Sequence, residues 1–115
     1  MFDVEDALNK IEINTDKIAG ILAEKGRLDV EQVNFLSKLY GNREILLKDL
    51  ELWYKTDEAT SYFLNNKKEF DKRIKKITEK DKSHLDNIEL RAKELKSKLK
   101  EMSKQKSVLL YAKES

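Results

Sequence analysis

Apolar residues recur every three or four positions along most of the chain, which is the period of amphipathic helices. Residues 3–25 show the most regular form, with steps of 4-3-4-3-4 along one face. That face consists of Val4, Leu8, Ile11, Thr15, Ile18 and Leu22. Because such steps are typical of a coiled-coil seam, they predict a helix that packs lengthwise on another helix. Gly26 is suited to end this helix as its C′ residue in the left-handed conformation.

A second helix is predicted over residues 30–55. Asp29 is suited to be its N-cap, and Gln32, three residues later, completes a pair resembling a capping box. Its apolar face is predicted to consist of Val33, Leu36, Tyr40, Leu47, Leu50 and Tyr54. Gly41-Asn42 falls inside this segment, and in an alternative interpretation the helix is kinked or divided there.

From Asn42 to Ser115 the chain has neither glycine nor proline, and a third helix is predicted over residues 57–112, with Thr56-Asp57 as its cap. Two successive steps of four, from Ile77 through Asp81 to Leu85, interrupt its apolar stripe as a stutter. In an alternative interpretation this helix breaks near residues 81–83 and folds back as a fourth helix.

These segments together predict an all-α protein, an antiparallel hairpin or bundle of three long helices. At 115 residues the chain is expected to form a single all-helical domain over residues 1–115. Aromatic residues flank the turn between the second and third helices and are expected to pack together at the end of the bundle. They are Trp53, Tyr54, Tyr62 and Phe63.

The third helix is predicted to be longer than either helix of the hairpin, so a straight third helix leaves its second half without an internal partner. The apolar residues of that half are Leu85, Ile88, Leu95, Leu99, Met102 and Leu109. An exposed apolar stripe of this length is unusual in a monomer. It therefore indicates a second copy of the chain, a bound client protein, or the fold-back.

Composition narrows the class of protein further. Charged residues make up 40% of the chain, and there is no cysteine, which excludes disulfides, zinc–thiolate sites and a cysteine nucleophile. No apolar run is long enough to span a membrane, and the beginning of the chain is acidic, so a cytoplasmic location is expected. Residues 1–57 carry 8 basic and 12 acidic side chains, and residues 58–115 carry 16 and 10, which favours attraction between the two halves.

Catalytic chemistry is not predicted. The single histidine, His84, is expected on a solvated helix surface, and the three glycines do not form a phosphate-binding loop. The chain is therefore expected to be a non-enzyme without a cofactor or metal. The lysine-rich region 67–82 is interrupted by four carboxylates, Glu69, Asp71, Glu79 and Asp81, which weakens its field on phosphates and disfavours nucleic acid as a partner.

Parts of the sequence resemble a known family. Ile77–Leu85, then Leu95, Leu99 and Met102, then the segment 104–111 (Lys-Gln-Lys-Ser-Val-Leu-Leu-Tyr), are similar to the C-terminal helix of FliT/FlgN-type flagellar export chaperones. Residues 36–47, in which an Arg-Glu pair precedes leucines, resemble the second helix of that family. The terminal Lys-Ser-x-x-x-Tyr is the most distinctive of these matches.

The resemblance implies a cytoplasmic export chaperone. Such a protein binds the helical terminus of a flagellar axial protein, a filament cap or hook-associated subunit, and delivers it to the type III export gate. The partner-binding residues would be Leu85, Ile88, Leu95, Leu99, Met102, Leu109 and Tyr111, with Tyr111 at the export gate. The alternative is a structural coiled coil that forms a homodimer through residues 84–112 and has no enzymatic activity.

Overall fold

The computed structural model describes the backbone of residues 2–24 and 26–114 and the side chains of residues 2–24 and 26–101. It contains three helices, α1 (Val4–Leu22), α2 (Val30–Tyr54) and α3 (Asp57–Glu114), and no strand within the described residues. The predicted all-α class with three packed helices is confirmed. The predicted helix ends lie within three residues of the observed ones.

Helix α1 begins at an N-cap and buries the predicted face. The Asp3 carboxylate accepts a hydrogen bond from the backbone N–H of Asp6 at 3.1 Å, which satisfies one free donor of the first turn. All six residues of the predicted seam are buried. The helix ends at Leu22, before the predicted residue 25, so Gly26 is not its C′ residue. Gly26 does adopt a positive φ of 95°, within the loop that leads to α2.

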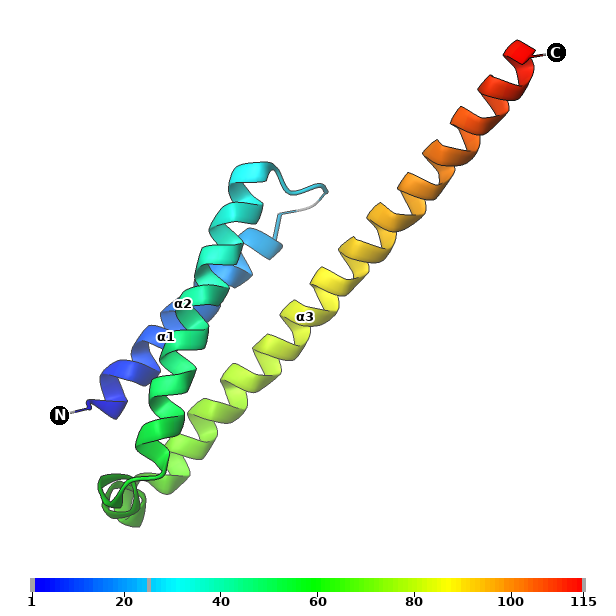
Figure 1. Cartoon of the computed structure of the whole chain (residues 1–115). Helices are drawn as coiled ribbons and strands as arrows, with labels where there is room; N and C mark the ends of the chain where they lie inside the picture. Colours follow the sequence, from blue (N-terminus) through cyan, green and yellow to red (C-terminus); the bar gives the residue numbers. More distant parts are fainter. Residues whose placement is uncertain (1, 25, 115) are drawn as a thin grey trace. The chain divides into compact units, whose positions relative to one another are not determined.

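Helix α2 runs antiparallel to α1, and the two lie side by side as a hairpin (Figure 1). The predicted capping box is present at its start. The Asp29 carboxylate accepts from the Gln32 backbone N–H at 2.7 Å, and the Gln32 side chain accepts from the Asp29 N–H at 2.9 Å. The helix continues through Gly41-Asn42, so the alternative division there does not occur.

The buried face of α2 differs from the prediction. The residues that it buries are Leu39, Arg43, Leu50 and Trp53, with Leu46 packed against the core. Three members of the predicted face, Val33, Leu47 and Tyr54, are 50%, 41% and 59% exposed. The prediction is confirmed for Leu50, which is buried, and was wrong for these three residues. The buried face instead includes Arg43, a charged residue seven positions from both Leu36 and Leu50.

Aromatic side chains pack together where the chain reverses from α2 to α3, as the sequence predicts. Trp53 is 5% exposed and lies in T-shaped contact with Tyr62 and Phe63, at centroid distances of 5.5 and 5.6 Å. Tyr54 contacts Phe63 with tilted rings, at a centroid distance of 5.4 Å. The Thr56 hydroxyl accepts from the backbone N–H of Ala59 at 3.3 Å, so Thr56 caps the start of α3.

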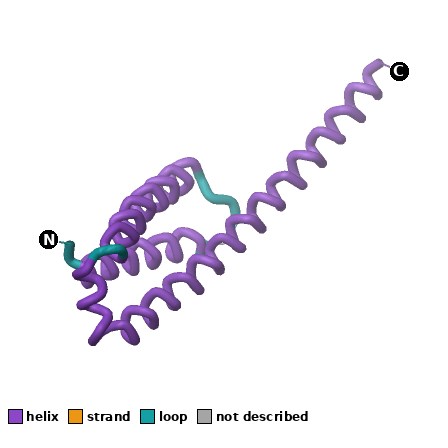
Figure 2. Tube along the Cα trace, turned by 60° about the horizontal axis from the view of Figure 1, so that its bottom comes forward, coloured by secondary structure: helices purple, strands orange, loops and turns teal. Residues whose placement is uncertain are grey.

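Helix α3 continues through residues 81–83 without a break, and the alternative fourth helix is not formed (Figure 2). By its internal contacts the chain divides into two compact units, Met1–His84 and Leu85–Ser115. In the first unit, Phe70 and Ile77 of α3 join the core with Leu8, Ile11 and Trp53. The stutter is therefore accommodated within one helix, which fits the absence of glycine and proline from Asn42 onward.

Candidate functional site

The second unit displays most of the predicted binding residues. Leu85, Leu95 and Leu99 are 53%, 45% and 55% exposed, and Ile88 is half-buried. The side chains of Met102, Leu109 and Tyr111 lie outside the described residues. We define the α3 stripe as Leu85, Ile88, Ala92, Leu95 and Leu99, whose steps of 3-4-3-4 place them on one side of the helix.

Lysines border the α3 stripe. Lys96 follows Ala92 by four residues and Lys98 follows Leu95 by three, so both lie next to the stripe and both are exposed. Glu89, four residues after Leu85, is an acidic neighbour at the beginning of the stripe. Leu90 is 59% exposed but falls on a different face of the helix. The stripe is thus an apolar strip whose later part has a basic edge.

Arg43 forms a second, buried polar cluster inside the first unit. Its guanidinium donates to Thr15 Oγ1 at 2.7 Å and to Asn14 Oδ1 at 3.1 Å, both on α1, and it forms a bidentate ion pair with Asp81 of α3. Asn14 Nδ2 in turn donates to the Leu39 carbonyl at 2.7 Å. The cluster therefore cross-links all three helices, and every partner is a hydrogen-bond acceptor suited to a buried cation.

His84 lies in the buried part of the same unit, at 9% exposure. The prediction of a solvated histidine is wrong, because position 84 follows Phe70 and Ile77 at steps of seven on the buried face of α3. Its Nδ1 atom has no hydrogen-bond partner among the residues whose side chains are described. Burial lowers the pKa of His84, the Asp81 charge opposes this shift, and the Arg43 charge reinforces it.

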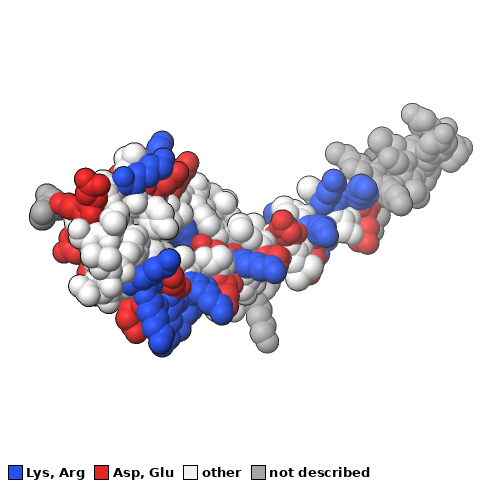
Figure 3. All heavy atoms as spheres, turned by 90° about the horizontal axis from the view of Figure 1, so that it is seen from below, with Lys and Arg blue, Asp and Glu red and all other residues white. Residues whose placement is uncertain are grey.

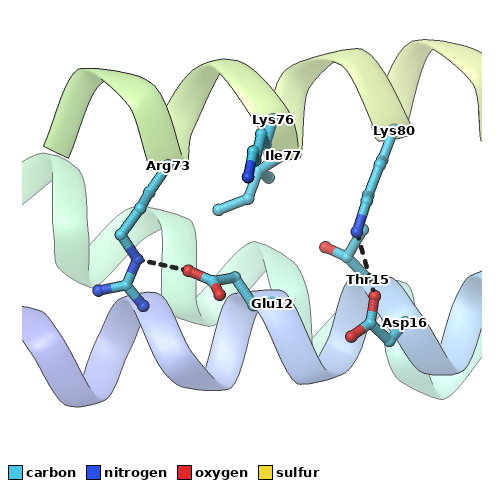
Figure 4. Close-up of a pocket in the computed structure, with 7 residues that line it drawn as sticks. All are labelled: Glu12, Thr15, Asp16, Arg73, Lys76, Ile77 and Lys80. Atoms are coloured by element: carbon cyan, nitrogen blue, oxygen red, sulfur yellow. Dashed lines mark hydrogen bonds and ion pairs between the residues drawn. The ribbon is translucent and has the colours of Figure 1, made fainter. Parts of the chain in front are cut away.

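A cleft between α1 and α3 of the first unit holds charged residues that compensate one another (Figure 4). Arg73 Nε donates to Glu12 Oε1 at 2.6 Å, and Lys80 Nζ lies 3.4 Å from Asp16 Oδ1. Thr15, Lys76 and Ile77 complete the lining. Both carboxylates are paired with cations of α3, so the charged residues of the cleft link α1 to α3.

The basic region 67–82 is partly engaged within the fold. Arg73 bonds to Glu5, Asn9 and Glu12 of α1, and Lys80 pairs with Asp16. The remaining lysines of the region are exposed: Lys67, Lys68, Lys72, Lys75, Lys76 and Lys82. Figure 3 shows Lys and Arg side chains interleaved with Asp and Glu side chains on the face that it draws. This mixture of signs lowers the field that an external phosphate would feel.

The described residues offer no group of three or more His, Cys, Asp or Glu side chains that could hold a metal ion. Among them there is likewise no helix both long and apolar enough to cross a membrane. Comparison of the chain with known protein families, curated proteins and solved structures finds no match.

Proposed function

We propose that this protein is a non-enzymatic binding module whose α3 stripe takes up an amphipathic helix of another protein. The observation that carries this proposal is the exposure of Leu85, Leu95 and Leu99, each 45% or more, on one face of a helix. Covering a leucine completely contributes about 1.5–3 kcal/mol, so even half of that at each residue favours a bound partner. Recognition would be of the helix-in-groove kind, read through anchors spaced three and four residues apart.

The specific form of the proposal is an export chaperone in the cytoplasm. The resemblance of residues 36–47 and 77–111 to FliT/FlgN-type flagellar chaperones supports it. On this proposal the partner is the helical terminus of a filament cap or hook-associated protein. Met102 and Leu109 would continue the binding face, and Tyr111 would contact the type III export gate.

Substitutions on the stripe test the proposal. The chain would be mixed with purified cap and hook-associated proteins, and complex formation would be followed by size-exclusion chromatography with light scattering. Leu95→Glu and Leu99→Glu should each abolish the complex while the helical circular dichroism is retained, because both side chains are about half exposed.

Leu90→Glu is the matched control, since Leu90 is exposed to a similar degree on the same helix but lies off the stripe. It should leave the complex intact. Failure of every axial protein to bind would remove the chaperone proposal. Equal damage from Leu90→Glu and Leu95→Glu would remove the stripe as the binding face.

The 3-4-3-4 spacing of the stripe also favours a second candidate, a structural coiled coil in which the stripes of two copies pack together. This candidate requires a concentration-dependent dimer and no heterologous partner. Light scattering on the isolated chain, followed by addition of the axial proteins, distinguishes it from the chaperone.

A further inference from the structure

A second apolar strip lies on α2, in the first unit. Val33, Tyr40, Leu47 and Tyr54 follow one another at steps of seven, so they form one column along the helix, which we name the α2 column. Three of its members are 41% to 59% exposed, and Tyr40 is half-buried. The column lies beside the buried face of α2, which consists of Leu39, Arg43, Leu50 and Trp53. The apolar surface of α2 is therefore wider than the part of it that the first unit buries.

Carboxylates border the α2 column. Glu44 follows Tyr40 by four residues and Glu51 follows Leu47 by four, so both lie next to the column, and both are exposed. The charge of this border is opposite to that of Lys96 and Lys98 beside the α3 stripe. The charges therefore favour contact between the column and the stripe over contact of either strip with its own copy.

The two strips also match in period and length. Leu85, Ala92 and Leu99 recur at steps of seven, as the members of the column do, so side chains of one strip can interdigitate with those of the other along their length. From Leu85 to Leu99 the stripe rises by 14 helical steps, or about 21 Å, and from Val33 to Tyr54 the column rises by 21 steps, or about 32 Å, at 1.5 Å per step. The column is thus long enough to accommodate the whole described stripe.

We propose that the occupant of the α2 column is the α3 stripe of a second copy of this chain. If both copies donate a stripe and accept one, the same contact forms twice, as in an isologous dimer. The inference rests on the proposed function in one respect, since it requires the stripe to be a protein-binding surface. It adds regulation of that surface, because a client helix would have to displace the column of the second copy.

A charge exchange tests this pairing without altering buried residues. The first variant, Glu44→Lys/Glu51→Lys, gives the column a basic border, and the second, Lys96→Glu/Lys98→Glu, gives the stripe an acidic one. Each variant alone then places like charges across the proposed contact. Its dimer should dissociate about tenfold more readily than that of the wild type, measured by sedimentation velocity across a concentration series. An equimolar mixture of the two variants restores opposite charges at both contacts and should dimerise as the wild type does.

Other pairings give different results. A dimer formed by two stripes would be unaffected by Glu44→Lys/Glu51→Lys, because those residues are not part of it. Such a result, a monomeric wild-type chain across the series, or a mixture no tighter than its separate components would overturn the inference.

The same variant separates this inference from the proposed function. Glu44→Lys/Glu51→Lys keeps the stripe unchanged, so it should bind the axial proteins at least as tightly as the wild type. Client binding together with an unaltered dimer contradicts only the second-copy pairing. If the dimer responds to the charge exchange but the wild-type chain binds no axial protein, only the chaperone proposal is contradicted.

Discussion

The guanidinium of Arg43 on α2 and the carboxylate of Asp81 on α3 form a bidentate ion pair, in which the Arg43 side chain is 5% exposed and the Asp81 side chain 31%. Burial of a cation is costly unless its charge and all its donors are satisfied. Asn14 and Thr15 supply the remaining acceptors from α1. A single side chain thus joins three helices, and its loss affects each of them.

Asp81→Asn is expected to destabilise the fold. The variant retains the size of the side chain but removes the charge opposite the buried guanidinium. We expect the free energy of unfolding to fall by about 2 kcal/mol, less than for a fully buried pair because the carboxylate is partly exposed. Urea denaturation followed by circular dichroism measures the change. Asp71→Asn, at an exposed carboxylate ten residues earlier on the same helix, is the control and should change stability by less than about 0.5 kcal/mol.

His84 is expected to make stability depend on pH. Because burial lowers its pKa in the folded protein, the unfolded chain takes up the proton first as the pH falls below 6.5. The contribution of the neutral His84 ring to stability is therefore fully present above pH 6.5. It is lost as the pH falls toward the lower pKa that His84 has in the folded protein. The charged groups that act on the ring are Asp81, Arg43, Lys80 and Asp16.

The comparison is between wild type and His84→Leu. The free energy of unfolding would be measured at about pH 7.5 and about pH 5.5, a range that brackets the ordinary histidine pKa and lies above those of most carboxyl groups. The wild type should lose stability over this range, and the variant should lose less. An equal loss in both proteins would assign the pH dependence to other groups.

Tyr62 is expected to ionise late. Burial and its hydrogen bond to Glu5 raise its pKa from 10.0 to about 12, with the Glu5 charge adding to the shift. Since the folded state keeps the phenol protonated, this contribution to stability is present below pH 10 and is lost as the pH rises toward about 12. Absorbance titration of tyrosinate should show a late step that Tyr62→Phe removes. A titration unchanged by that substitution would contradict the assignment.

Trp53 is expected to report on the core and to support it. It is the only tryptophan, and it contacts Phe2, Tyr62, Phe63 and Phe70 at centroid distances of 5.5 to 6.1 Å. Its fluorescence should therefore shift to longer wavelength on unfolding. Trp53→Ala should cost about 3–5 kcal/mol, measured by thermal denaturation, because it leaves a cavity among four rings. Tyr54→Ala, at an exposed ring of the same turn, should cost clearly less.

The sequence was sufficient for the elements whose determinants are local or strictly periodic. The α1 seam, the Asp29–Gln32 capping box and the aromatic contacts around Trp53 all follow the prediction. A capping box depends on two residues three positions apart, and a seam on a repeated step. Neither needs information from distant parts of the chain.

The features that the sequence did not predict depend on contacts between helices. Arg43 is buried only because acceptors from α1 and α3 surround it, so the α2 pattern alone favoured Val33 and Leu47 over the true face. His84 was placed in solvent for a similar reason, since its neighbours in the sequence are charged. The step of seven from Ile77 to His84 was the available signal for its burial. The α3 stripe was predicted as apolar, and Leu85, Leu95 and Leu99 are exposed on it.

The cluster around Arg43 also constrains how this sequence can diverge. A replacement of Arg43 leaves Asp81 without its cation and alters the surroundings of Asn14 and Thr15, so the effects of changes at these positions do not add. Tolerated changes in related sequences would have to occur together on three helices. Among homologues, positions 14, 15, 43 and 81 should therefore covary, and the set should be retained or replaced as a unit.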